Sequence, residues 1–108
     1  MGLFSRSNTV TAQEVHEQMV GGGKFILLDV RSPGEYRQIR IPGAKLIPLD
    51  QIPSRAAPEL PNRDATIYVY CHSGARASSA VRLLTGMGYT NVSNLGGIIT
   101  WPYETEKG

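Results

Sequence analysis

The sequence contains a single cysteine, Cys71, among its 108 residues. One thiol forms neither an internal disulfide nor a multi-thiolate metal site, so Cys71 is either a small buried residue or a reactive thiol. The sequence has no apolar run near the roughly 20 residues that a membrane-spanning helix needs, and residues 1–8 lack the apolar stretch of a signal peptide. These absences predict a reducing, cytoplasmic setting without a membrane partner.

Clustered charge is also scarce. The 11 basic and 9 acidic residues give a net charge of +2, and no two Lys or Arg residues are adjacent. Because surfaces that bind nucleic acids or membranes usually carry clustered cations, we expect neither among the partners. The length and the 41% hydrophobic fraction predict one folded domain over residues 9–106, preceded by a flexible tail over residues 1–8.

In the first half of the chain, sequence patterns predict two helices around one strand. A capping box over 11–14 begins a helix that ends at the glycines 21–23. The apolar run 25–30 predicts a strand buried on both faces. A second capping box over 32–35 opens one or two helical turns, and residues 41–44 form a turn.

The middle of the chain gives weaker signals. Residues 45–47 predict a short strand that Pro48 closes. Asp50 is positioned to cap a weak helix over 51–57, which Pro53 should damage.

The second half predicts two further strands around a helix. Residues 66–70 are rich in β-branched and aromatic residues and predict a strand, with Cys71 directly after it. Apolar spacing predicts a helix over 76–86, then a short strand over 91–95 and a terminal helical segment that carries Trp101. Strands that alternate with helices imply an α/β domain with a mainly parallel sheet covered on both faces.

The loop from Cys71 to Arg76 is the most informative stretch. Open parallel sheets bind ligands beyond the carboxyl ends of their strands, where this loop stands. Gly74 tolerates an unusual φ angle, so the loop can curl with its amides pointing inward, and the next helix adds its N-terminal partial charge. Arg76 can supply a bidentate fork. The loop is therefore suited to stabilise an anion such as a thiolate.

Two readings of Cys71 compete. A lone cysteine after an apolar strand is more often a core residue than a nucleophile. The anion-binding character of the loop reverses that expectation and favours a nucleophile. His72 is a candidate general base or anion contact, or a loop residue that faces water, and we assign it no proton transfer.

These residues resemble the rhodanese-like sulfurtransferases, and specifically their single-domain members. The resemblance spans the chain from Thr11 to Trp101 and rests on four motifs in the same order. They are Leu28-Asp29-Val30-Arg31 followed by Glu35-Tyr36; Ile41-Pro42-Gly43-Ala44; Cys71-His72-Ser73-Gly74-Ala75-Arg76; and Leu95-Gly96-Gly97 with Trp101.

The resemblance implies a fold, an activity and a site. The fold is a five-stranded, mainly parallel sheet flanked by helices on both faces. The activity is that of a thiosulfate sulfurtransferase, in which Cys71 takes the outer sulfur of thiosulfate as a persulfide and passes it to cyanide or to a protein thiol, without a cofactor or a metal. Sulfur-relay proteins are candidate partners. The substrate-binding loop would comprise His72, Ser73, Gly74, Ala75 and Arg76, braced by Asp29, Arg31 and Glu35.

Two local features distinguish this chain from its relatives. Related phosphatases have five residues between the cysteine and the arginine, whereas this loop has four, which favours sulfur transfer over phosphatase or arsenate-reductase chemistry. Where the family usually has Gly-His, this chain has Ile39-Arg40.

The sequence leaves one alternative function open. A persulfide carrier or interaction module, fed by a partner protein, would have little activity toward thiosulfate itself. In either case the single cysteine requires that the sulfur acceptor come from outside the chain. We also expect a positive field at the loop to attract the thiosulfate dianion, so that salt raises the apparent KM.

Overall fold

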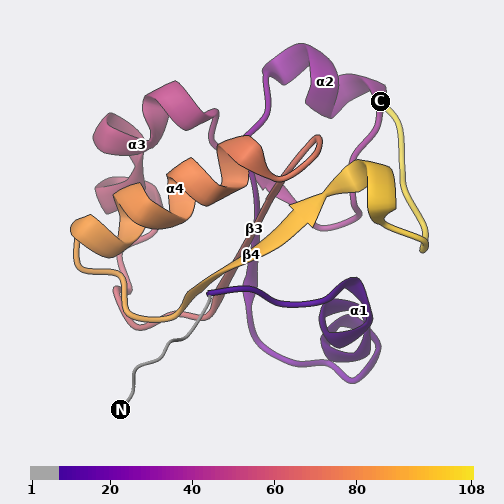
Figure 1. Ribbon diagram of the computed structural model, residues 1–108, viewed down its shortest axis with the longest axis horizontal. Coiled ribbons are helices and arrows are strands. Elements are labelled where there is room, and N and C mark those ends of the chain that lie inside the picture. The colour runs from indigo at the N-terminus through magenta and orange to yellow at the C-terminus, as the bar shows by residue number, and fades with distance from the viewer. Residues whose placement is uncertain (1–7) are drawn as a thin grey trace.

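The computed structural model describes residues 8–108 and shows one α/β unit (Figure 1). The predicted tail over 1–8 lies outside the described residues except for Asn8, whose carbonyl accepts a hydrogen bond from the Asn94 amide. The elements, in chain order, are α1 (Ala12–Val20), β1 (Ile26–Asp29), α2 (Pro33–Gln38), β2 (Lys45–Leu46), η1 (Leu49–Gln51), α3 (Ile52–Glu59), β3 (Ile67–Cys71), α4 (Ala75–Gly86), β4 (Val92–Gly97) and η2 (Ile98–Thr100).

The sheet is parallel throughout, with strand order β2-β1-β3-β4. It has four strands among the described residues, so the expected fifth strand is wrong. The physical reason is limited pairing beside β4, where Thr9 forms only an isolated parallel bridge with Asn94. All four strands run in one direction, so their carboxyl ends, and the loops that follow them, meet at one edge.

One face of the sheet is covered by α3 and α4 (Figure 1). The apolar runs in β1 and β3 place side chains on both faces, as expected for strands with no solvent-facing side. The core on this face comprises Leu28, Val30, Ile47, Ile52, Ala56, Leu60, Ile67, Val69, Cys71, Ala77, Ala80, Val81, Leu84, Tyr89 and Val92.

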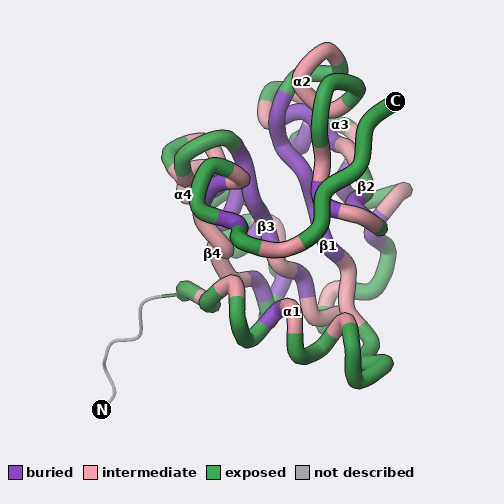
Figure 2. Tube along the Cα trace, turned by 90° about the vertical axis from the view of Figure 1, so that its right-hand side faces the viewer, coloured by how far each residue is buried: buried purple, intermediate pink, exposed green. Residues whose placement is uncertain are grey.

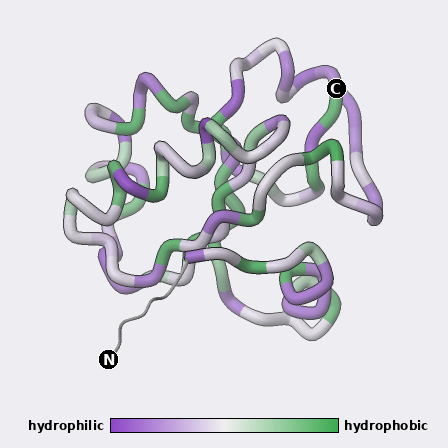
Figure 3. Tube along the Cα trace, viewed as in Figure 1, coloured by the Kyte–Doolittle hydropathy of each residue, from purple (hydrophilic) through white to green (hydrophobic). Residues whose placement is uncertain are grey.

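The opposite face packs against α1 and the C-terminal segment. Hydrophilic and hydrophobic residues mix around α1, and its buried residue Val15 joins Leu27, Tyr70 and Trp101 in a second core cluster (Figure 3). The tube view shows the same arrangement, with buried residues along the central strands and exposed residues along much of α1 and at the chain end (Figure 2). Burial on both faces fixes the strand positions and thereby the edge from which the loops emerge.

Both predicted capping boxes are present. The Thr11 hydroxyl accepts from the Glu14 amide at 3.0 Å, and the Ser32 hydroxyl accepts from the Glu35 amide at 3.2 Å. Each glutamate carboxylate in turn accepts from the amide of its N-cap residue, which satisfies backbone donors that a helix start leaves free. The second box holds Glu35 in a fixed place, which matters for the site.

The helix predicted over 51–57 is correct in kind but wrong in its details. Asp50 lies within η1, and its side chain caps nothing. Pro53 lies in the first turn of α3, where an N–H would have no helical partner, so it does not damage the helix. Pro58 lies near the end of α3.

The terminal segment is not a regular helix. Trp101 follows the short 3-10 turn η2, and its indole N–H donates to the Glu104 carbonyl at 2.9 Å. The Tyr103 ring packs edge-on against Trp101, with 5.1 Å between ring centroids. Local hydrogen bonds and aromatic packing therefore hold the segment in place of helical bonds. No helix among residues 8–108 is long and apolar enough to cross a membrane.

Candidate active site

Cys71 is the last residue of β3. Its sulfur accepts hydrogen bonds from two backbone amides, one in the loop that follows and one in α4. The Gly74 amide lies 3.0 Å from Sγ and the Ala77 amide 3.4 Å from it. Gly74 supplies the required bend with a φ of 111° at the N-cap of α4. The loop thus directs backbone donors at the sulfur, as the sequence predicted, and can stabilise negative charge there.

The residue directly after Arg76, Ala77, also contributes to the site. The structure uses its amide as a donor to Sγ and buries its methyl group completely. A contribution from a backbone amide does not depend on residue type, so the sequence carried no signal for it.

The sulfur itself is buried. Cys71 is 1% exposed and belongs to the core cluster beneath α3 and α4. A charge in such a place is costly unless hydrogen-bond donors compensate it. The two amides meet that requirement, so the geometry suits a thiolate or an anionic persulfide better than burial alone would suggest.

The end of β4 packs against the backbone of the loop that follows Cys71. A Cβ atom at Gly97 would collide with the His72 carbonyl oxygen and the Ser73 backbone. The Ile99 amide donates to the same His72 carbonyl at 3.3 Å. The structure thus places the Gly96-Gly97 pair, part of one of the four sequence motifs, directly against the candidate loop.

Arg76 forms an ion pair with Glu35 across the top of the sheet. Its two terminal nitrogens donate to the Glu35 carboxylate oxygens at 2.8 and 3.0 Å. These bonds, with those from Ser32, hold the pKa of Glu35 at about 2, and the same pairing raises the pKa of Arg76. The Arg76 guanidinium, which was expected to form two hydrogen bonds to a substrate anion, therefore forms them with the Glu35 carboxylate.

Asp29 and Arg31 form a separate, fully buried ion pair. The Arg31 Nη2 atom lies 2.7 Å from the Asp29 carboxylate and 2.6 Å from the Ile39 carbonyl that it also bonds. Burial opposes the Arg31 charge, but the hydrogen bonds and charge of Asp29 raise its pKa above the ordinary value. The guanidinium also lies over the Tyr70 ring, 5.5 Å from its centroid. The pair joins the end of β1 to the loop before β2.

The three residues expected to brace the loop, Asp29, Arg31 and Glu35, thus belong to two separate ion pairs. Asp29 bonds Arg31, while Glu35 bonds Arg76. Arg40, which stands where the family usually has histidine, bonds Glu106 at 3.0 Å and stacks on Tyr36. It is directed toward the chain end and does not line the hollows beside the loop.

The other loop residues lie at the surface. His72, Ser73 and Ala75 are exposed, while Gly74 and Arg76 are partly buried. Among residues 8–108, no hydrogen bond joins the His72 side chain to a carboxylate that would orient it as a base, whereas its carbonyl accepts from the Ile99 amide. The structure therefore brings the loop backbone, rather than these side chains, to the sulfur.

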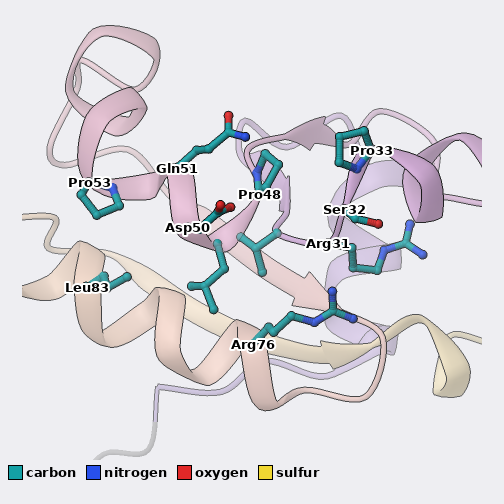
Figure 4. A pocket seen from close by; sticks show the side chains of 11 residues that line it. Arg31, Ser32, Pro33, Pro48, Asp50, Gln51, Pro53, Arg76 and Leu83 are labelled. Atoms are coloured by element: carbon teal, nitrogen blue, oxygen red, sulfur yellow. The ribbon is translucent and has the colours of Figure 1, made fainter.

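Two hollows flank the loop. The larger, about 600 Å³, is lined by Arg31, Ser32, Pro33, Pro48, Asp50 and Arg76 among others. Figure 4 shows the guanidinium groups of Arg31 and Arg76 on the side of this hollow near Ser32, away from Gln51 and Pro53. The second hollow, about 510 Å³, includes Glu35, His72, Ile99 and Trp101. The sequence did not predict which residues line these hollows, because the lining residues come from loops that are far apart in the chain.

The described residues contain no group of three or more His, Cys, Asp or Glu side chains that could hold a metal ion. The loop itself presents the Cys71 thiol with two backbone donors, and the Glu35–Arg76 ion pair lies at its end.

Comparisons with known proteins agree on the kind of protein this is. Residues 11–102 match the family model described as a rhodanese-like domain. The chain is 41% identical over 71 residues to thiosulfate sulfurtransferase PspE of Escherichia coli (strain K12), covering 66% of this chain and 68% of that protein. It is also 41% identical over 95 residues to the putative sulfur carrier protein YrkF of Bacillus subtilis (strain 168), covering 86% of this chain and 50% of that protein.

Solved structures show the same fold. The crystal structure of the Alr3790 protein from Anabaena sp. superposes with a TM-score of 0.85 at 32% identity, covering 91% of each chain. The matched range 11–102 includes the α/β core and the loop after β3. The chain belongs to the rhodanese-like domain family of sulfurtransferases.

Proposed function

We propose that the protein is a thiosulfate sulfurtransferase with Cys71 as the sulfur-carrying nucleophile. The Cys71 thiolate attacks the outer sulfur of thiosulfate, a new S–S bond forms, and the S–S bond of thiosulfate breaks with its electron pair leaving on sulfite. The resulting persulfide then transfers its outer sulfur to cyanide or another thiophilic acceptor, which yields thiocyanate from cyanide and restores the thiolate.

One observation carries this proposal: the amides of Gly74 and Ala77 both donate to the Cys71 sulfur. Thiolate, transition state and persulfide all place negative charge inside the loop, where preorganised backbone donors stabilise it without reorganisation. The similarity to a protein named thiosulfate sulfurtransferase supports thiosulfate as the donor.

The other loop residues have supporting roles in this proposal. The backbone of His72, Ser73 and Ala75 forms the exposed rim through which a donor reaches the buried sulfur. Arg76 keeps N–H groups beyond the two bonded to Glu35, and these can contact the sulfonate end of the donor. The Asp29–Arg31 pair holds the neighbouring loop in place.

A second candidate function is that of a sulfur carrier loaded by a partner protein. Burial of Cys71 and the similarity to a putative sulfur carrier protein favour it. The same persulfide would form on Cys71, but the donor would be a protein persulfide, and a sulfur-relay protein would be the partner.

Intact-mass spectrometry after incubation with thiosulfate tests the first function against the second. We expect a gain of one sulfur atom that disappears in Cys71→Ser and is released by cyanide as thiocyanate. A folded protein whose Cys71 reacts with iodoacetamide but gains no sulfur from thiosulfate would contradict the thiosulfate assignment and favour the carrier.

A further inference from the structure

The positive and negative side chains that line the two hollows beside the candidate site are equal in number. Four charged side chains line the two hollows: Arg31 and Arg76 are positive, while Glu35 and Asp50 are negative. Arg76 is paired with Glu35, and Arg31 is paired with Asp29 beneath the hollows. The four lining side chains therefore carry no net charge, and the backbone amides that donate to the sulfur are the remaining attraction for an anion.

We propose that Glu35 is a specificity-determining residue that selects sulfur donors by charge, disfavouring dianions such as thiosulfate relative to donors with one negative charge. The inference rests on the proposed sulfur transfer to Cys71 and specifies its donor class. Monoanionic donors include organic thiosulfonates and organic persulfides.

The position of Glu35 is fixed from two sides, which makes it a permanent part of the site. One carboxylate oxygen accepts from the Ser32 amide at 3.0 Å as part of the capping box and from Arg76 at 2.8 Å. The other accepts from Arg76 at 3.0 Å. A side chain held by backbone and guanidinium together stays beside the loop while a donor enters.

Glu35 is also ionised under all ordinary conditions, since Arg76 and Ser32 keep its pKa at about 2. Arg76 ends the loop that begins at Cys71 and lines the larger hollow, which places its guanidinium beside the site. The Glu35 carboxylate is bonded to this guanidinium and offsets its attraction for an anion. A donor with two charges feels the offset twice as strongly as a donor with one.

The best test variant is Glu35→Gln. Glutamine at the third helical position also closes a capping box, so α2 should keep its start. The amide oxygen can still accept from Arg76, so the orientation of the guanidinium is largely retained while the negative charge is removed. The variant therefore separates the charge of Glu35 from its role as a brace.

Thiosulfate and methanethiosulfonate form a matched pair of probes. Both present an outer sulfur on a tetrahedral sulfur centre, but a methyl group in methanethiosulfonate replaces one charged oxygen. Attack by Cys71 gives the same persulfide in both cases, with sulfite or methanesulfinate as the leaving group that takes the electron pair. The two donors differ mainly by one unit of charge.

In steady-state assays with cyanide as acceptor, Glu35→Gln should lower the KM for thiosulfate about 3- to 10-fold more than the KM for methanethiosulfonate. High salt should shrink this difference, because the hollows are open to solvent. Equal changes for the two donors, within twofold, would show that Glu35 acts only as a brace and would overturn the proposal.

Glu59→Gln is the matched control. Glu59 also accepts two hydrogen bonds from an arginine, Arg55, and its pKa is likewise held at about 2, but it lines neither hollow. This variant should leave the ratio of the two KM values unchanged. A ratio that shifts equally in both variants would mean a general charge effect and would also overturn the proposal.

A binding assay distinguishes failure of this inference from failure of the proposed function. Sulfate and methanesulfonate, which transfer no sulfur, should slow alkylation of Cys71 by iodoacetamide when they occupy the loop. Glu35→Gln should strengthen protection by sulfate more than protection by methanesulfonate. If no donor transfers sulfur to Cys71 but Glu35→Gln still strengthens protection by sulfate more than protection by methanesulfonate, the proposed function fails and the charge selection stands. If Glu35→Gln changes protection by the two anions equally, the charge selection is refuted.

Discussion

The backbone at Gly97 lies so close to His72 that any side chain at position 97 would overlap the His72 carbonyl oxygen. The contact joins the end of β4 to the loop after β3, although the two residues lie far apart in the sequence. A Cβ atom at the N-cap residue, Gly74, would come within 3.6 Å of the Gly96 Cα atom. The curve of the candidate loop therefore depends on backbone from the neighbouring strand.

Gly97→Ala should displace the loop and remove its amides from the sulfur. We expect a loss of stability of about 1–3 kcal/mol and a large fall in sulfur loading of Cys71. Urea unfolding and intact-mass spectrometry measure the two effects. Gly86→Ala is the control, because a Cβ atom there meets nothing within 4 Å and should raise stability by up to about 1 kcal/mol. Full loading in Gly97→Ala would refute this account of the loop.

Cys71→Ser should abolish persulfide formation while leaving the fold intact. A hydroxyl group occupies nearly the same space as the thiol and can accept from the same two amides. The thiocyanate assay should fall to background, and circular dichroism should match that of the natural protein. Turnover above background in this variant would remove Cys71 from the reaction.

Asp29→Asn should destabilise the protein strongly. Asp29 is 0% exposed and Arg31 2% exposed, so the variant leaves a buried guanidinium without its opposite charge. Breaking such a pair from one side costs about 3–5 kcal/mol, measurable by urea unfolding. Exposed Asp64→Asn serves as the comparison and should change stability by less than about 1 kcal/mol. Similar losses in both variants would contradict a structural role for the buried pair.

The Glu35–Arg76 pair should give a pH-dependent part of the stability. The pKa of Glu35 is lowered from 4.5 to about 2, so its contribution is complete above pH 4.5 and is lost as the pH falls toward 2. We expect the natural protein to exceed Glu35→Gln in free energy of unfolding by up to about 1 kcal/mol at pH 7. The difference should shrink between pH 4.5 and 2, and a constant difference across that range would contradict the pairing.

Arg40→Ala should leave sulfur transfer nearly unchanged. The Arg40 guanidinium bonds Glu106 and the Tyr36 carbonyl, and it lines neither hollow. The variant should lower stability by up to about 1 kcal/mol through the lost ion pair, with KM for thiosulfate within twofold of the natural value. A KM that rises tenfold would show that Arg40 contributes to thiosulfate binding and would contradict this prediction.

Much of the secondary structure could be predicted from the sequence, because its signals are local. The two capping boxes, the glycine exits and the apolar runs of β1 and β3 each depend on residues a few positions apart. The prediction for Pro53 was wrong because the effect of a proline depends on its position in the helix, and in the first turn the N–H that proline lacks has no helical partner. The terminal segment was misjudged because aromatic packing around Trp101 replaces helical hydrogen bonds.

The sequence by itself predicted the α/β class and the position of the loop after β3, and its single cysteine made Cys71 the one candidate thiol, since these follow from periodicity, spacing and composition. Only the tertiary structure decided how the charges pair. Glu35 and Arg76 are 41 positions apart, and their contact requires α2 and the start of α4 to meet above the sheet. Ion pairs and close backbone contacts depend on distances of a few ångströms between distant segments, and such distances exist only after the chain has folded.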